Sequence, residues 1–126
     1  MKERYAGILL PITALPSPYG VGSFGKEARS FVDFLVKAGQ KIWQVLPLPP
    51  TGYGDSPYSS SCAIAGSPYL IDIDVLIEQG LLTQEEAEEY SCDGADSNAQ
   101  GKKVNYEALF YRRIPLLKIA FSRFDK

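Results

Sequence analysis

Two short apolar runs on either side of one amphipathic segment constrain the fold of this chain more than any other feature. The runs are Tyr5–Pro11 (YAGILLP) and Lys41–Pro47 (KIWQVLP), and both have the composition of strands that are buried on both faces. From Lys26 onward, apolar residues recur at helical spacing, and Gly39 stands where a helix end favours a left-handed residue. The order strand, helix, strand predicts a βαβ unit with parallel strands. The expected helical stripe is Ala28, Phe31, Leu35 and Ala38, widened by Val32 and Phe34.

A βαβ unit of this kind is not stable alone. Strands with two apolar faces need further strands at their edges and helices above and below the sheet. The chain has 126 residues, which is room for one ordinary domain, yet few other segments have the composition of strands. We therefore expect an α/β protein whose sheet is incomplete in this chain.

Charge and composition exclude several classes of function. The net charge is -2 and no Lys/Arg run exceeds two residues, so neither nucleic acid nor a membrane surface is expected as a partner. The chain has no secretory signal and no apolar run long enough to span a bilayer, which predicts a cytosolic protein. Histidine is absent and Cys62 and Cys92 form no close pair, so we expect no metal, no Ser-His or Cys-His nucleophile, and two reduced thiols.

The second half of the chain predicts one more strand. Ile71, Ile73 and Val75 alternate with Asp72 and Asp74, which is the pattern of a strand with one solvated face. On such a strand the two aspartates share a face and could form a pair of catalytic carboxylates. Nothing near them supplies the burial that separates the pKa values of an acid and its partner, so we favour a solvated face.

The remaining segments predict helices and loops. Thr83–Glu86 (TQEE) is a capping box that opens a short helix, and Ser91–Lys103 is a polar loop. Asn105 can cap the last helix, which Pro115 should kink or divide. The apolar stripe of that helix is Phe110, Ile114, Leu117, Phe121 and Phe124.

One glycine motif imitates a nucleotide-binding site. Gly20–Gly25 (GVGSFG) matches G-x-G-x-x-G and precedes the first helix. A dinucleotide site requires the first glycine directly after the strand and an acidic residue about twenty positions further on. Here residues 11–19, with three prolines, follow the strand, and no acidic residue lies between Asp33 and Asp55. We therefore expect a turn with positive φ angles and close packing, not a cofactor site.

Aromatic residues on a loop suggest a binding site. Large aromatics usually belong to the core, and we expect Trp43 and Tyr69 there or at its edge. Thr51–Ser61 (TGYGDSPYSSS) differs, because it follows the second strand at the end where parallel sheets place their ligands. A tyrosine ring can stack on a sugar while serine and aspartate meet its hydroxyls, although turn residues alone also fit an ordinary surface loop. The candidate binding residues are Tyr53, Asp55, Ser56 and Tyr58.

Four segments resemble one enzyme family in the order in which they occur. They are GILLPITALPSPYGVGSFG, IWQVLPLPPTGYGDSPYSS, AGSPYLIDIDVL and VNYEALFYRRIPLLKIAFSRF. Together they resemble the start of bacterial 4-α-glucanotransferases (amylomaltase or disproportionating enzyme). The resemblance implies a TIM (β/α)8 barrel of the α-amylase clan. It also implies transfer of α-1,4-glucan segments between maltooligosaccharide, amylose or starch chains, without metal or organic cofactor.

The resemblance assigns parts of the barrel to this chain. Residues 1–126 would be the N-terminal segment of the catalytic barrel, with the start of an inserted helical subdomain after about residue 75. Ala6–Pro11 and Lys41–Leu46 would be its first two strands. The rest of the barrel would then be the immediate partner of this chain.

The resemblance also assigns roles in the loop. Tyr58 matches a tyrosine that stacks on the sugar at the cleavage subsite, Ser56 and Asp55 match polar residues of the same wall, and Tyr53 matches an aromatic residue of an accessory glucan site. Departures from many relatives are Pro11-Ile12 in place of a histidine-proline pair and Pro49 in place of glycine.

The catalytic carboxylates are not expected in this chain. Retaining glycosyl transfer needs a nucleophile and an acid/base roughly 5–5.5 Å apart. In the family these residues lie far downstream of the region of resemblance. The alternatives are a non-catalytic glucan-binding module and another glycosidase of the same clan.

Overall fold

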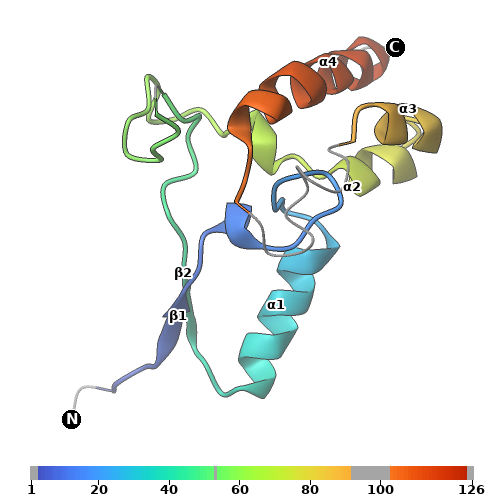
Figure 1. The fold of residues 1–126 in the computed structure, drawn as a ribbon. Coiled ribbons are helices and arrows are strands. Elements are labelled where there is room, and N and C mark those ends of the chain that lie inside the picture. Colours follow the sequence, from blue (N-terminus) through green and yellow to red (C-terminus); the bar gives the residue numbers. More distant parts are fainter. Residues whose placement is uncertain (1–2, 53, 92–102, 125–126) are drawn as a thin grey trace.

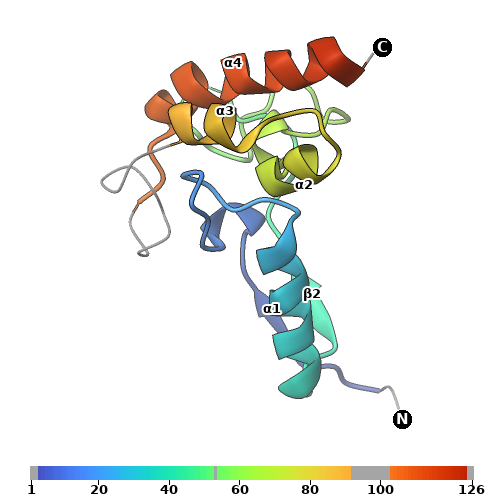
Figure 2. The same ribbon diagram turned by 90° about the vertical axis from the view of Figure 1, so that its right-hand side faces the viewer.

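The computed structural model describes residues 3–52, 54–91 and 103–124 (Figure 1). Helices α2, α3 and α4 gather beyond the carboxyl ends of two strands that lie beside α1 (Figures 1 and 2). The elements in chain order are β1 (Gly7–Leu9), the 3-10 helix η1 (Ile12–Ala14), α1 (Lys26–Lys37), β2 (Ile42–Gln44), the 3-10 helix η2 (Pro68–Leu70), α2 (Ile73–Glu78), α3 (Gln84–Glu89) and α4 (Tyr106–Phe124).

The predicted βαβ unit is confirmed. β1 and β2 pair in parallel with Gly7 opposite Ile42, and α1 connects them. The strands approach closely because position 7 has no side chain: a Cβ there would lie 2.6 Å from the Ile42 carbonyl oxygen. At the end of α1, Gly39 has φ +70°, as the sequence predicts. The paired segments have three residues each and are shorter than the predicted strands.

The predicted burial of both strand faces is not found. Ile8, Leu9 and Ile42 are 40%, 55% and 48% exposed. The reason is that α1 lies on one side of the strands and no other described element covers them (Figure 2). Trp43, by contrast, lies at the edge of the core, as predicted. Its Nε1–H donates to the Leu10 carbonyl at 2.9 Å, and its ring meets that of Phe31 edge-on at 4.9 Å.

The helices beyond the strands have a core of their own. Its members come from α2, α3, α4 and the turn after α2. The core of the βαβ unit is separate and includes a residue of η2. The first cluster is Ile73, Leu82, Ala87, Leu116 and Ala120, and the second is Ile12, Leu15, Ala28 and Leu70.

The strand predicted over residues 71–75 is wrong, because α2 begins at Ile73. Asp72 is its N-cap: Oδ1 accepts a hydrogen bond from the Val75 N–H at 3.1 Å. An aspartate that can cap stabilises a helix start, and this local bond outweighs the alternating pattern. The two aspartates do not form a carboxylate pair. Asp72 accepts from the Ser23 hydroxyl and Asp74 from the Tyr19 hydroxyl, each at 2.6 Å.

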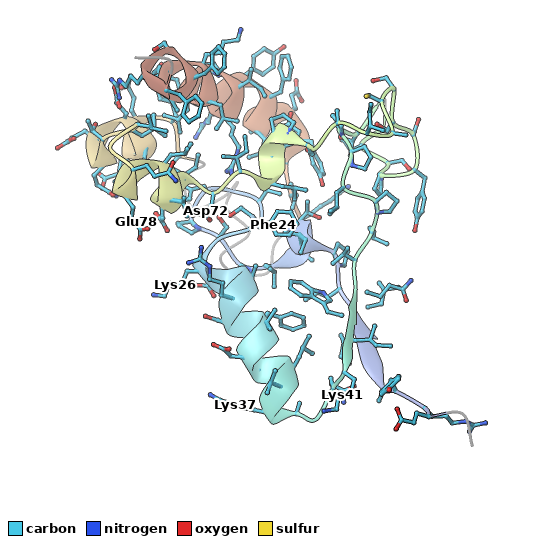
Figure 3. All side chains as sticks on the ribbon, turned by 180° about the vertical axis from the view of Figure 1, so that it is seen from behind. Phe24, Lys26, Lys37, Lys41, Asp72 and Glu78 are labelled. Carbon is cyan, nitrogen blue, oxygen red and sulfur yellow. The ribbon has the colours of Figure 1, made fainter. Side chains whose placement is uncertain are left out.

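The glycine motif is a packing element, as expected. Gly20 has φ +83°. A Cβ at Gly22 would overlap the Ile12 carbonyl oxygen, and a Cβ at Gly25 would overlap the Asp72 carboxylate. Asp72 therefore lies against the start of α1 while it caps α2 (Figure 3). Its negative charge is favourable at both helix N-termini.

The last helix begins as predicted and continues beyond Pro115, where a kink or a break was expected. Asn105 Oδ1 accepts from the Ala108 N–H at 3.1 Å, which confirms the cap. Pro115 does not divide the helix, because α4 continues to Phe124. Packing of Leu116 and Ala120 just beyond the proline stabilises that continuation. The predicted stripe is not the buried face: its phenylalanines at 110, 121 and 124 are 56%, 71% and 73% exposed. The buried residues of α4 are Leu109, Arg113, Leu116 and Ala120.

An ion pair joins α3 to the end of α4. The predicted capping box is present, with Thr83 Oγ1 and Glu86 Oε2 each accepting from the other residue's N–H. The Arg123 guanidinium donates to both Glu86 oxygens, at 2.8 and 2.7 Å. The hydrogen bonds from Arg123, with that from the Thr83 N–H, lower the pKa of Glu86 from 4.5 to about 2.

This pair predicts a pH-dependent contribution to stability. A lowered carboxylate pKa means that the contribution is present above pH 4.5 and is lost as the pH falls toward 2. Glu86→Gln should therefore lower the melting temperature slightly at pH 6, and the difference from wild type should vanish near pH 2. The effect is small because the pair is exposed to solvent. Glu89→Gln, on the same helix, is the control. An equal difference at both pH values would contradict the assignment.

Candidate glucan-binding site

The tyrosine-containing loop lies at the carboxyl end of β2, as predicted. The chain departs at Leu48 and returns at Ser67, where the Ser67 N–H donates to the Leu48 carbonyl at 2.9 Å. Of the intervening residues, 49–52 and 54–66 project beyond the strands (Figure 1). Prolines at 47, 49 and 50 limit the backbone conformations of the segment that enters the loop.

A tight turn presents Tyr58. The Ser59 N–H donates to the Ser56 carbonyl at 3.1 Å, and the Tyr58 N–H donates to Ser56 Oγ at 3.3 Å. Pro57 occupies the second position of this turn, where its fixed φ angle is favourable. Tyr58 follows and is 75% exposed. Ser56 is half-buried, and the hydrogen bond to its hydroxyl oxygen orients the backbone of Tyr58.

A second turn presents Asp55. The Asp55 N–H donates to the Gly52 carbonyl at 3.2 Å, and Gly54 has φ +82°. Asp55 itself has φ +56°, the one positive φ angle of a non-glycine residue in the part of the chain that the structure describes. Such a conformation is mildly strained and marks a position where function is worth testing. Gly52 has no room for a Cβ, because the Ser59 carbonyl approaches it across the loop.

A cleft separates this loop from the start of α4. Tyr69 of η2 and Tyr106 of α4 meet edge-on in it, with ring centroids 5.9 Å apart. Burial and then the nearby Asp55 charge raise the pKa of Tyr69. Burial also raises the pKa of Tyr106, where the Asp55 charge acts in the same direction and a hydrogen bond with Thr13 opposes it. The cleft is lined by Thr51, Gly52, Gly54, Asp55, Tyr69, Tyr106, Glu107, Phe110 and Tyr111.

The lining of the cleft fits a ligand that has apolar faces and many hydroxyl groups. Aromatic rings can stack on such faces, and the carboxylates of Asp55 and Glu107 can accept from hydroxyls. The structure thus brings Asp55 together with Tyr69, the latter at the core edge as predicted. Tyr53 lies outside the described residues. The residues of α4 were not predicted as part of a site, although the spacing of Tyr106 and Phe110, one turn apart after the capping Asn105, was the available signal.

Two negative findings apply to the described residues. Within the ranges given above, no three His, Cys, Asp or Glu side chains lie close enough together to hold a metal ion. None of the helices in those ranges is long and apolar enough to cross a membrane. Cys62 is a free thiol, and Cys92 lies outside the described residues.

A parallel βαβ unit with an aromatic cleft beyond its strands defines an α/β protein of the kind that binds ligands at the carboxyl end of its sheet. Residues 10–126 match the family model described as 4-alpha-glucanotransferase. The chain therefore belongs to the 4-alpha-glucanotransferase family.

Individual relatives agree with this membership. The chain is 49% identical over 123 residues to a 4-alpha-glucanotransferase of Thermus thermophilus and 48% identical over 124 residues to one of Streptococcus pneumoniae; each alignment covers 98% of this chain. It is 39% identical over 122 residues, 97% of this chain, to a chloroplastic/amyloplastic 4-alpha-glucanotransferase of Arabidopsis thaliana. The alignments cover 23%, 24% and 20% of those relatives, so the chain spans about a quarter or less of their length.

A solved structure has the same arrangement of elements. An amylomaltase from Streptococcus agalactiae, in complex with acarbose, superposes with a TM-score of 0.86 at 42% identity. The match covers 97% of this chain and 24% of the amylomaltase. The α/β fold of the described residues is thus that of part of an amylomaltase.

Proposed function

We propose that this chain is the N-terminal part of a 4-α-glucanotransferase that transfers α-1,4-glucan segments between maltodextrin or starch chains. The observation that carries the proposal is the exposed Tyr58 on the loop that follows β2, in a chain of this family whose same loop lines an aromatic cleft through Asp55. The amylomaltase of similar structure is in complex with acarbose, which supports an oligosaccharide ligand.

In this proposal the chain supplies part of the binding site, and the rest of the full-length protein, here called the parent, supplies the catalytic residues. β1 and β2 are the first strands of a TIM barrel, and α2, α3 and α4 begin an inserted helical subdomain with its own core. Tyr58 stacks on the sugar at the cleavage subsite, with Ser56 and Asp55 on the same wall. Tyr53 contributes to an accessory glucan site beside the main groove. The nucleophile and the acid/base come from the remainder of the barrel.

The test compares the full-length parent with residues 1–126. With maltotriose, the parent should form glucose together with longer maltodextrins, and residues 1–126 alone should form neither above a blank. Products from residues 1–126 would contradict the assignment of chemistry to carboxylates elsewhere in the parent. A parent that binds maltodextrins without converting them would favour the rival, a non-catalytic glucan-binding module. The cytosolic location stays a prediction, since the Arabidopsis relative is named for plastids.

A further inference from the structure

Arg113 is a charged side chain buried between α4 and η2. It is 3% exposed, and no other Asp, Glu, Lys or Arg of the described residues is buried to that degree. A buried charge is costly unless it is well paired, and an apolar residue would fill such a position more simply. Its guanidinium donates to the carbonyl of Ile71, the C-cap residue of η2. This hydrogen bond therefore links α4 to the end of η2.

The bond fixes the element that carries Tyr69. Two further hydrogen bonds hold η2 and its start: the Phe24 N–H donates to the Leu70 carbonyl at 3.0 Å, and the Ser67 N–H donates to the Leu48 carbonyl at 2.9 Å. The partners in these two bonds belong to the βαβ region: Phe24 precedes α1, and Leu48 follows β2. Arg113 supplies the bond from α4, the helix that forms the opposite wall of the cleft.

Arg113 also acts on Tyr69 through its charge. The guanidinium opposes the rise in the pKa of Tyr69 that burial and Asp55 cause, so it lies within electrostatic reach of the phenol. Tyr69 in turn meets Tyr106 edge-on at 5.9 Å. Both rings line the cleft between the loop and α4.

We propose that Arg113 is a positioning residue for glucan binding in this cleft. By joining α4 to the end of η2, it holds Tyr69 against Tyr106 and so maintains the aromatic lining of the cleft. This inference depends on the proposed function. Ser56 and Tyr58 do not line the cleft. Arg113 should therefore matter more for long glucans that extend past Asp55 into the cleft than for maltotriose stacked on Tyr58.

The experiment measures KM and kcat of the full-length parent for amylose and for maltotriose. Arg113→Met should raise the ratio of the two KM values (amylose to maltotriose) about tenfold, with KM changing more than kcat, because a hydrogen bond from a charged group is lost. Arg113→Lys, which keeps the charge with a single-point donor, should raise the ratio about threefold. Arg112→Met is the matched control, because Arg112 donates to the Ser91 carbonyl instead, and it should leave the ratio as in wild type.

A second readout separates this inference from the proposed function. In the parent labelled with ¹³C at tyrosine Cζ, the Tyr69 signal should shift in Arg113→Met and stay in place in Arg112→Met. If the parent has no transferase activity, the proposed function fails and the Tyr69 signal still tests Arg113. An unchanged KM ratio in folded Arg113→Met overturns the inference, as does an unmoved Tyr69 signal. If Arg113→Met does not fold, a wild-type ratio in Arg113→Lys overturns it.

Discussion

Replacement of Tyr58 by alanine in the full-length parent is expected to lower kcat/KM for maltotriose about 100-fold. The ring is 75% exposed on a turn that Pro57 and Ser56 stiffen, so little conformational entropy is lost when it stacks on a sugar. In the proposed site the sugar at the cleavage subsite distorts toward an oxocarbenium-like transition state, and we expect the stacked ring to help to position it there. Because that contact belongs to the transition state as well as to the bound substrate, kcat should share the loss.

Two companion variants make the result specific. Tyr58→Phe keeps the aromatic face and should retain most of the activity. Tyr53→Ala should leave maltotriose kinetics near wild type and alter turnover of long glucans, because Tyr53 is assigned to the accessory site. Steady-state kinetics on both substrates provide the measurement. Wild-type turnover of maltotriose by Tyr58→Ala would show that the loop is structural and that the site assignment is wrong.

Gly25→Ala is expected to destabilise the protein by about 3 kcal/mol. An added Cβ at this position overlaps the Asp72 carboxylate, which caps α2 and accepts from the Ser23 hydroxyl. The carboxylate must move and lose at least one of these bonds, so steric and hydrogen-bond costs add. A loss of this size is a large fraction of typical domain stability, roughly 5–15 kcal/mol. The loss of stability is measured as the shift in the urea midpoint of the full-length parent, with limited proteolysis as the probe of unfolding.

A matched glycine and a double variant provide the controls. Gly66→Ala should have little effect, because a Cβ at Gly66 meets no atom within 4 Å. In the Gly25→Ala background, Asp72→Ser replaces the carboxylate by a shorter capping side chain and should recover part of the loss. Equal stability of the Gly25→Ala and Gly66→Ala proteins would show that the contact of Asp72 with the start of α1 does not contribute to the free energy of unfolding.

Much of the local structure could be predicted from the sequence. The parallel βαβ unit, the caps at Thr83 and Asn105 and the left-handed Gly39 follow from spacing and from side chains that bond to their own backbone. The packing role of the glycine motif was predictable for another reason: residues 11–19 separate it from the strand, and no acidic residue lies between Asp33 and Asp55. The position of the loop with Ser56 and Tyr58 beyond β2 was also predictable, because parallel strands present their following loops at one end.

The tertiary structure decided what depends on residues distant in sequence. Residues 71–75 satisfy both a strand pattern and a helix start. The cap bond from the Val75 N–H to Asp72 favours the helix start, and the contacts of Asp72 with Ser23, 49 positions away, and with the start of α1 hold the carboxylate in place for it. Likewise, the cleft combines Asp55 of the loop with Tyr106 of α4, and no local pattern encodes that approach. Sequence periodicity indicates which backbone hydrogen bonds a segment can form. The contacts that stabilise one of these alternatives form only when segments distant in sequence pack together.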